Sequence, residues 1–289
     1  MGWPFDGISD WIKQTLTDAI MASFQGSFDY VNQKVTDVAT QVGQTPQGWN
    51  SGIFSMIKTL SDTVVIPIAG IILTYVLCYE LIQLVIERNN MHDFETFNFF
   101  KWIFKAFVAI FILTNTWNIV MGVFDLGQHV INQAAGVITG STDLGSPAMM
   151  DAIYTQLQGM GIGELLGLYL ETSLINICLF IMGIIIFIVV VGRMIEIFLT
   201  VSIAPIPMAT MVNREWGQMG NRYLKTLFAL AFQGFLIMVC IGIYAVLVGQ
   251  IATASSIHAA IWTLAGYTVL LCFILIKTGG MAKGIFSAG

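Results

Sequence analysis

Five long apolar runs constrain this chain more strongly than any other feature of its sequence. They lie at residues 64–86, 103–124, 172–200, 223–248 and 259–276. Each run is long enough, or nearly so, to cross about 30 Å of hydrocarbon as an α-helix. Hydrophobic residues make up 56% of the chain and charged residues only 10%, far from the balance of a soluble domain. We therefore predict an all-α integral membrane protein with about five transmembrane helices.

The basic residues give the predicted helices an orientation. Nine of the 12 Lys and Arg residues lie on one side of the predicted bundle, namely Arg88, Lys101, Lys105, Arg193, Arg214, Arg222, Lys225, Lys277 and Lys283. The stretches 125–171 and 249–258 contain no Lys or Arg. Because cytoplasmic loops carry the excess of Lys and Arg, we predict a multi-pass protein of the cytoplasmic (cell) membrane. Its C-terminus is then cytoplasmic, its N-terminus is outside, and residues 125–171 form an outer loop.

Residues 1–62 are predicted to form amphipathic helices outside the membrane or in its interface, ahead of a polytopic transmembrane domain at 63–289. Their apolar residues Phe24, Phe28, Val31, Val35, Val38 and Val42 are spaced by four and three positions. This spacing is typical of an apolar seam along one helix face. Such a seam can pack on a partner helix, lie in the membrane interface or cover the chain's own bundle. Residues 44–48 break the helix, and residues 1–20 lack the features of a cleaved signal peptide.

The segment 194–212, MIEIFLTVSIAPIPMATMV, is apolar enough to be a sixth span. A sixth span, however, would place the later basic residues in conflicting compartments. Pro205 and Pro207 remove two backbone donors and disfavour helix before each proline. We therefore predict that the third span runs on past Arg193 to near Ala204 and that a helix break or a re-entrant piece follows. Irregular backbone at membrane depth persists only where protein or water covers it, so this break is expected to face the interior of an assembly.

Polar side chains inside the predicted spans cost free energy when they contact lipid, so they usually face other helices or water. The polar candidates are Thr114, Asn115, Thr116, Asn118, Asn176 and Gln233, and the charged ones are Glu80, Arg193 and Glu196. The group at 114–118 can join helices by hydrogen bonds or line a water-filled path. Asn176 and Gln233 are expected to make contacts between helices. Glu80 is expected to reach the membrane interface, and Arg193 and Glu196, one turn apart, can pair.

The sequence contains no recognisable catalytic or metal-binding pattern. His92, His129 and His258 have no metal-ligand spacing, and no phosphate-binding glycine loop precedes a Lys-Ser or Lys-Thr pair. The four Cys residues lie within apolar runs, as small buried hydrophobic residues do. We predict a protein without enzymatic activity, cofactor or metal.

Several stretches carry a resemblance to a known family. They read QVGQTPQGWNSGIF at 41–54, YELIQLVIERNNMHDFETF at 79–97, GRMIEIFLTVSIAPIPMATMVNREWG at 192–217 and QMGNRYLKTLFALAFQGFLIMV at 218–239. This text resembles the TrbL-like polytopic membrane subunit of conjugative type IV secretion systems, a VirB-type channel component, in the version carried by mobile elements of Gram-positive anaerobes. The N-terminal region is short and a large extracytoplasmic domain is missing, which argues against a direct bridge to an outer envelope.

The resemblance implies a part of the channel that passes relaxase-bound single-stranded DNA or proteins between cells. It implies a ring-shaped homo-oligomer, with a pentamer favoured, and partners that include other membrane subunits and separate ATPases. Membrane lipid is a further expected partner, with phospholipid bound to the apolar outer faces. Whether DNA touches this subunit directly is left open by the sequence.

Two other functions are alternatives to a channel subunit. A small-molecule transporter or permease would need a midplane site built from broken helices, commonly in paired repeats, and the sequence has one Pro-interrupted segment, at 204–207. A membrane receptor or immunity protein would be a monomer whose activity resides in its loops. A ring-shaped assembly would distinguish the channel subunit from both.

Overall fold

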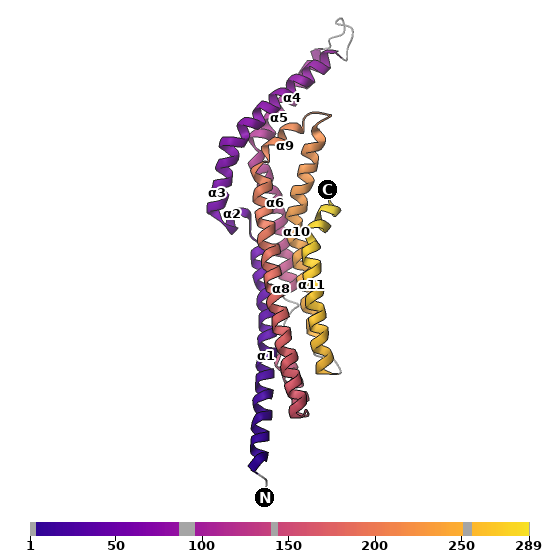
Figure 1. Ribbon diagram of the computed structural model, residues 1–289. Coiled ribbons are helices and arrows are strands. Elements are labelled where there is room, and N and C mark those ends of the chain that lie inside the picture. Colours follow the sequence, from indigo (N-terminus) through magenta and orange to yellow (C-terminus); the bar gives the residue numbers. More distant parts are fainter. Residues whose placement is uncertain (1–3, 87–95, 140–143, 251–255, 289) are drawn as a thin grey trace. The chain divides into compact units, whose positions relative to one another are not determined.

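The computed structural model describes residues 4–86, 96–139, 144–250 and 256–288, and every regular element in these ranges is helical. The α-helices are α1 (Pro4–Val42), α2 (Pro46–Trp49), α3 (Ser51–Leu60), α4 (Ile66–Ile86), α5 (Thr96–Thr114), α6 (Thr116–Thr139), α7 (Pro147–Gln158), α8 (Ile162–Ser202), α9 (Pro205–Thr210), α10 (Gly217–Gly249) and α11 (Ile257–Ile285) (Figure 1). A single π-helical turn, Ser61–Val65, joins α3 to α4. Arg88 and His92 lie outside the described residues.

Five helical stretches of the described chain are long and apolar enough to cross a membrane. They are Ser51–Ile86, Phe97–Thr114, Ile162–Ser202, Gly217–Gly249 and Ile257–Ile285. Each overlaps one of the apolar runs recognised in the sequence, and the prediction of an all-α, multi-pass membrane protein is confirmed. The first stretch joins α3, the π-helical turn and α4, and the other four belong to α5, α8, α10 and α11.

The second membrane helix ends earlier than the apolar run 103–124 suggested. Helix α5 ends at Thr114, Asn115 forms a turn, and α6 begins at Thr116. The Thr114 hydroxyl donates to the Ile110 carbonyl (2.9 Å), and the Asn115 side-chain amide donates to the Phe111 carbonyl (2.9 Å). Such side-chain bonds to the preceding turn compete with the helical backbone pattern. The backbone bonds from Asn115 N–H to Phe111 (3.1 Å) and from Ile119 N–H to Asn115 (3.0 Å) nevertheless remain, so a turn of one residue separates α5 from α6.

Much of the predicted outer loop, 125–171, is also helical. Helix α6 continues to Thr139, α7 occupies Pro147–Gln158, and α8 begins at Ile162. Asp143, one of the acids of this stretch, lies outside the described residues. Gly145 has φ +84°, a conformation that glycine adopts without strain, and it leads into α7.

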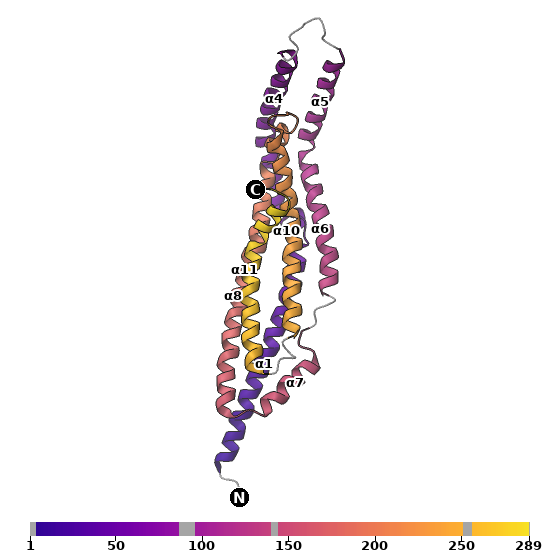
Figure 2. The same ribbon diagram turned by 90° about the vertical axis from the view of Figure 1, so that its right-hand side faces the viewer.

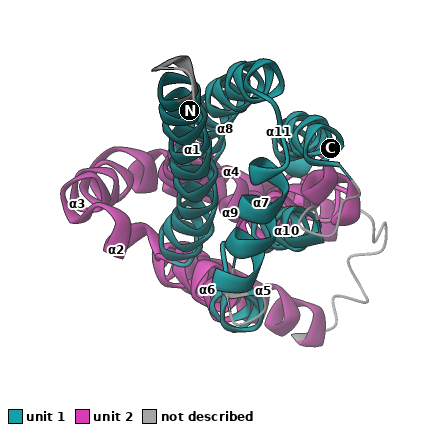
Figure 3. Cartoon of the chain, turned by 90° about the horizontal axis from the view of Figure 1, so that it is seen from below, with its two compact units in different colours: residues 1–43, 130–191, 235–278 teal, residues 44–129, 192–234, 279–289 magenta. Residues whose placement is uncertain are grey.

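The chain divides into two compact units (Figure 3). Unit 1 comprises Met1–Gly43, Val130–Val191 and Phe235–Thr278. Unit 2 comprises Gln44–His129, Gly192–Gly234 and Gly279–Gly289. Helices α6, α8, α10 and α11 contribute residues to both units.

In unit 1 the apolar seam of α1 is covered by the chain itself. All six predicted seam residues are buried, with Phe24 the most exposed at 6%. The seam belongs to one continuous core with apolar residues of α7, α8, α10 and α11, among them Ile153, Leu179 and Leu264. Of the three ways to use the seam, the structure thus shows burial within the protein's own bundle.

Helices α8, α10 and α11 meet in the same unit. The Tyr244 hydroxyl of α10 and the Thr268 hydroxyl of α11 form a buried hydrogen bond of 2.9 Å. An apolar cavity of 220 Å³ lies between Cys178 on α8 and Cys272 on α11. In Figure 2, α8 and α11 run side by side. Hydrogen bonds and close packing hold helices together where lipid offers no hydrophobic driving force.

In unit 2 the segment after α8 is broken by its prolines, as predicted. Helix α8 ends at Ser202, and the short helix α9 starts at Pro205. Pro205 and Pro207 are both buried. Helix α9 packs against α4 and α5, where Ala69, Ala109 and Ala209 share one small core. The residues 194–202 therefore extend the third span, and protein covers the break itself.

Candidate functional site

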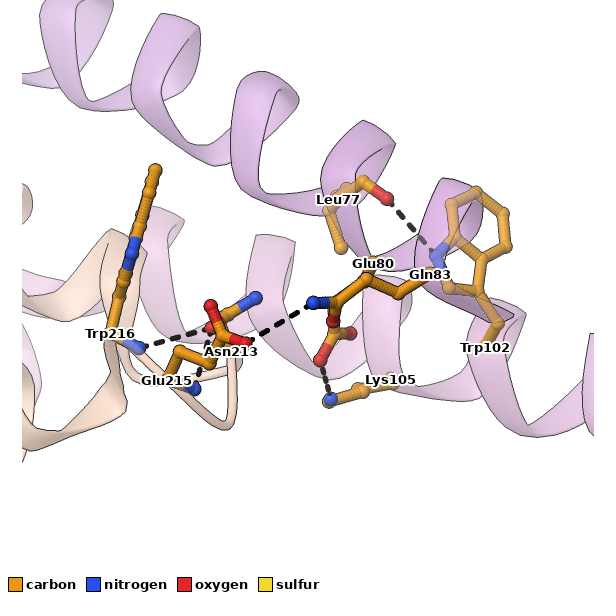
Figure 4. A network of polar contacts seen from close by, with 8 residues as sticks. All are labelled: Leu77, Glu80, Gln83, Trp102, Lys105, Asn213, Glu215 and Trp216. Atoms are coloured by element: carbon orange, nitrogen blue, oxygen red, sulfur yellow. Dashed lines mark hydrogen bonds and ion pairs between the residues drawn. The ribbon is translucent and has the colours of Figure 1, made fainter. Parts of the chain in front are cut away.

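A polar network in unit 2 connects α4, α5 and the segment that leads into α10 (Figure 4). Glu80 of α4 forms an ion pair with Lys105 of α5. The Glu80 side chain is 11% exposed and that of Lys105 is 40% exposed. The Trp102 indole N–H of α5 also donates to the Leu77 carbonyl of α4, at 3.3 Å. Two polar contacts thus join two helices that are otherwise strongly apolar.

Glu215 is the second carboxylate of this network. It accepts hydrogen bonds from the Tyr79 hydroxyl (3.3 Å) and from the Gln83 side-chain amide (3.2 Å). The neighbouring Trp216 ring stacks on Tyr75 and Tyr79, with centroid distances of 5.6 and 6.0 Å. The segment between α9 and α10 is therefore held on the surface of α4 by both polar and aromatic contacts.

Asn213 sets the conformation of this segment. Its side-chain oxygen accepts from the backbone N–H groups of Glu215 (2.7 Å) and Trp216 (3.0 Å). Both N–H groups lie in the turn before α10, and an Asn side chain commonly accepts from backbone N–H groups of such a turn. Asn213 is only 2% exposed, and its side-chain amide nitrogen finds no acceptor within the described chain. The side chain is thus committed to positioning Glu215 and Trp216 just before α10.

A cavity of 460 Å³ lies beside this network. Its lining residues are Glu80, Gln83, Leu84, Asn98, Lys101, Trp102, Lys105 and Arg214. Three of these side chains are cationic and one is anionic, so the cavity has a positive balance. The Lys101 ammonium also lies 4.5 Å from the centre of the Phe97 ring. Cations beside aromatic and aliphatic surface are suited to an anionic group such as a phosphate. The lining contains no nucleophile paired with a base.

A second set of charged residues lies near the start of the unit 2 part of α8. Arg193 is 5% exposed, and its guanidinium donates to the carbonyls of Leu230 (3.0 Å) and Ala231 (3.3 Å) of α10. Glu196 instead pairs with Lys283 of α11 at 2.7 Å. Arg193 and Glu196 therefore bind different helices rather than each other, because each finds a partner on a neighbouring helix. Among the described residues no carboxylate pairs with Arg193.

The polar group at 114–118 does not act as one unit in the structure. The hydroxyls of Thr114 and Thr116 and the amide of Asn115 all donate to carbonyls one turn earlier in the chain. Thr116 is buried, while Thr114 and Asn118 are exposed. The bonds that these groups make therefore stay within α5 and the junction to α6, and among the described residues none reaches a third helix.

Asn176 and Gln233 occupy different environments. Asn176 of α8 donates to the Ser23 hydroxyl (2.9 Å) and accepts from the Ser27 hydroxyl (3.0 Å), both on α1. Gln233 of α10 is 6% exposed, and its side-chain oxygen has no partner in the described chain. A side chain added at Gly279 of α11 would meet the Gln233 amide at 3.2 Å, so α10 and α11 approach closely there.

Sequence reasoning missed most of the network shown in Figure 4. It selected Glu80, but not Lys105 as its partner, and it did not select Gln83, Asn213 or Glu215. Asn is favoured in turns, where its side chain accepts from backbone N–H groups two residues on, so Asn213, four residues before α10, could have been found. The partners of Glu215 lie 132 and 136 residues away along the chain and give no local signal.

Comparison with known proteins identifies the family. The sequence model of the TrbL/VirB6 plasmid conjugal transfer like proteins matches residues 31–205. The chain belongs to the TrbL/VirB6 family. The resemblance recognised in the sequence is therefore confirmed, and the chain is a component of the conjugal transfer machinery. Searches of curated proteins and of solved structures gave no match.

The residues that match the TrbL/VirB6 model span much of both units. The match begins in the second half of α1, includes Glu80, Lys105 and Arg193, and ends at Pro205, the first residue of α9. Asn213 and Glu215 lie beyond it. The ion pair between α4 and α5, the buried Arg193 and the end of α8 are thus within the family region.

Proposed function

We propose that this chain is a membrane subunit of the channel of a conjugative type IV secretion system. In this role it contributes to the path taken by single-stranded DNA–relaxase complexes or by protein substrates. The observation that carries the proposal is the family match over residues 31–205. The five long apolar helices support it, because a path across a membrane requires several of them.

The polar groups of the spans support a scaffold more than a transporter. A transporter of small molecules needs convergent ligands at a helix break. At Asn115 the backbone N–H still donates to the Phe111 carbonyl (3.1 Å), and its carbonyl accepts from Ile119 (3.0 Å). The break at Pro205 and Pro207 is packed against α4 and α5. Neither break presents a set of free ligands, which favours a structural role without catalysis.

The proposal includes an assembly and an orientation. Several copies would form a ring around the path, with a pentamer favoured, and would contact other membrane subunits and separate ATPases. The N-terminus would lie outside the cell membrane and the C-terminus in the cytoplasm, as the distribution of Lys and Arg indicates. Phospholipid would be bound, and the cavity offers Lys101 and Arg214 for its phosphate, beside Lys105, which is paired with Glu80.

The decisive test is deletion of the gene from a conjugative donor strain. We expect transfer of the element to be lost and to return when the intact gene is supplied in trans, because each channel subunit is needed for a continuous path. Uptake of amino acids and sugars is the control and should not change. Transfer at the normal frequency in the deletion strain would refute the channel role, and altered solute uptake with normal transfer would favour a transporter.

The assembly is tested separately, on the purified full-length protein. Its mass, measured by light scattering in mild detergent and in nanodiscs, should correspond to a closed ring of identical subunits. A monodisperse monomer in both environments would exclude the ring.

A further inference from the structure

The 460 Å³ cavity beside the Glu80–Lys105 pair lies where α4 and α5 approach the connection between them. Leu84 is in the last turn of α4 and Lys101 is in the second turn of α5, and both residues line the cavity. Trp102, whose ring is apolar and whose N–H is polar, lines it as well (Figure 4). Such side chains are enriched at the level of the lipid headgroups. On the proposed orientation, this level is the cytoplasmic boundary of the membrane.

Two of the cations that line the cavity are available to bind an anion. Lys101 and Arg214 are both exposed, and among the described residues neither forms an ion pair. Lys105 is paired with Glu80. The carboxylate of Glu215, close by in the same network, accepts hydrogen bonds from two side chains of α4. Both carboxylates of this region are thus already bonded, and the charge that is left without a partner is positive.

The outward face of α5 is apolar and aromatic. Five of its phenylalanines are 56–68% exposed and follow one another at spacings of three and four positions, so they lie on one face of the helix. We call them the phenylalanine stripe of α5, and they are Phe97, Phe100, Phe104, Phe107 and Phe111. Ile103 and Ile110, which are also exposed, lie beside the stripe. This face of α5 therefore has the composition that lipid tails require.

Lys101 lies at the boundary between the cavity and the phenylalanine stripe. It follows Phe97 by four positions and precedes Phe104 by three, so the three side chains are neighbours on the surface of α5. Its ammonium is 4.5 Å from the centre of the Phe97 ring. A molecule that places an anionic group in the cavity therefore has an apolar surface immediately beside it. A phospholipid has both parts, a phosphate and acyl chains.

The surroundings of the phenylalanine stripe favour lipid over a strand of nucleic acid. The stripe lies entirely within Phe97–Thr114, one of the five helical stretches that are long and apolar enough to cross a membrane. Only 11% of this stretch is buried within the protein, the smallest share among the five. A polyanionic strand needs cations along its length. Here the two unpaired cations, Lys101 and Arg214, lie at one end of an apolar face.

We propose that the cavity and the phenylalanine stripe together bind one anionic phospholipid of the cytoplasmic leaflet. Its phosphate contacts Lys101 and Arg214, and its acyl chains lie along α5. Because Arg214 belongs to the segment before α10, the bound phosphate ties that segment to α5. A zwitterionic lipid binds less tightly, since its ammonium group opposes the two cations. The inference rests on the proposed function, from which it takes the orientation and the presence of phospholipid, and it identifies the class of lipid and its site.

The proposal is tested by lipid binding to the full-length protein, purified in mild detergent and freed of copurified lipid. Dioleoyl phosphatidylglycerol or dioleoyl phosphatidylethanolamine is added in steps, and bound lipid is measured by native mass spectrometry. The test variant combines Lys101→Gln with Arg214→Gln. The matched control combines Arg222→Gln with Lys225→Gln, which removes two exposed cations of α10 that do not line the cavity. A third variant, Lys101→Arg with Arg214→Lys, keeps both charges.

We expect phosphatidylglycerol to bind more tightly than phosphatidylethanolamine. The test variant should bind phosphatidylglycerol roughly thirtyfold more weakly, since each Lys or Arg near an anionic lipid contributes about five- to sixfold to binding. The matched control should bind as the unmodified protein does, and the variant that keeps both charges should stay within about threefold of it. Undiminished binding by the test variant would overturn the proposal. So would an equal loss in the test and control variants, because the attraction would then be non-specific.

Competition on the unmodified protein separates the possible sources of the phosphate and needs no variant. Glycerophosphoglycerol and inorganic phosphate should displace deuterated phosphatidylglycerol at least about a hundredfold less well than unlabelled lipid does, because they have no chains to cover the phenylalanine stripe. Equal displacement by inorganic phosphate would mean that the cavity binds free phosphate, and displacement by a single-stranded oligonucleotide would indicate a nucleic acid site. Either result would overturn the lipid site. Transfer after gene deletion is scored independently, so a failure here would leave the channel role intact.

Discussion

Arg193 is a buried charge, 5% exposed, whose acceptors are two backbone carbonyls of α10. A guanidinium presents five N–H donors, and the two contacts to Leu230 and Ala231 leave most of them without a described acceptor. Taking a charge out of water costs several kcal/mol, and two charge-assisted hydrogen bonds offset only part of this. The burial of such a residue therefore costs more free energy than its two hydrogen bonds return. We therefore expect its removal to affect transfer more than stability.

Substituting Arg193 separates the two roles. Because Met fills a similar volume without a charge to desolvate, Arg193→Met should keep or raise the thermal midpoint of the purified protein, yet reduce transfer. Arg193→Glu should lower the midpoint, since it places a buried carboxylate against two carbonyl oxygens at a cost of about 3–5 kcal/mol. Thermal unfolding in detergent and mating assays provide the two readouts. If Arg193→Met destabilises as much as Arg193→Glu, the guanidinium mainly ties α8 to α10.

At the scale of secondary-structure elements, the end of α8 follows directly from its prolines. Pro205 has no N–H to donate to the Val201 carbonyl, which instead accepts from Ala204 at 3.1 Å, closing a tighter turn. Pro207 likewise cannot donate to Ile203. The chain therefore leaves the axis of α8, and α9 can pack between α4 and α5. The break after α8 therefore allows α9 to pack against α4 and α5.

Replacing both residues, Pro205→Ala with Pro207→Ala, restores the two donors and allows α8 to continue. We expect transfer to fall while the amount of protein in the membrane stays near normal, because each span remains apolar. Mating assays and immunoblots measure the two quantities. Pro147→Ala is a suitable control, since Pro147 is the first residue of α7, where proline is tolerated. Normal transfer by the double variant would mean that the break is incidental.

Secondary-structure elements could be predicted from the sequence better than the contacts between them. The seam of α1 and the break at residues 204–207 depend on spacing and on proline, which are local properties of the sequence. The Glu80–Lys105 pair joins residues 25 positions apart, and the Lys283–Glu196 pair joins residues 87 positions apart. Nothing near Arg193 indicated that carbonyls of α10 would replace Glu196 as its partners. Long-range pairing is set by the packing of whole helices, and one sequence does not encode it visibly.

At the scale of the whole molecule, the proposed topology places the two ends of α8 in different compartments. Gln156 of α7 and Arg214 before α10 are both exposed, and one membrane helix, α8, lies between them. Lys and Arg are concentrated beyond its C-terminal end. On the proposed orientation, Gln156 is outside and Arg214 is cytoplasmic.

This orientation can be measured in intact cells. In a variant without native Cys residues, Gln156→Cys should react with an impermeant maleimide added outside, because it lies in water. Arg214→Cys should react only after the membrane is permeabilised. A separate variant that retains Cys272, buried in the bundle, as its single Cys serves as an unreactive control. Reaction of both engineered residues from the same side would contradict the orientation and the five crossings.

The composition of unit 1 from distant parts of the chain also dictates when it can form during synthesis. The hydrogen bond between Ser27 and Asn176 can form only after Asn176 is translated, 149 residues later. This is a delay of roughly 7–30 s at bacterial elongation rates. The segments of α10 and α11 that complete the same core come later still. Through this interval the apolar seam of α1 is uncovered. Residence of α1 in the membrane interface would cover the seam until α11 is made.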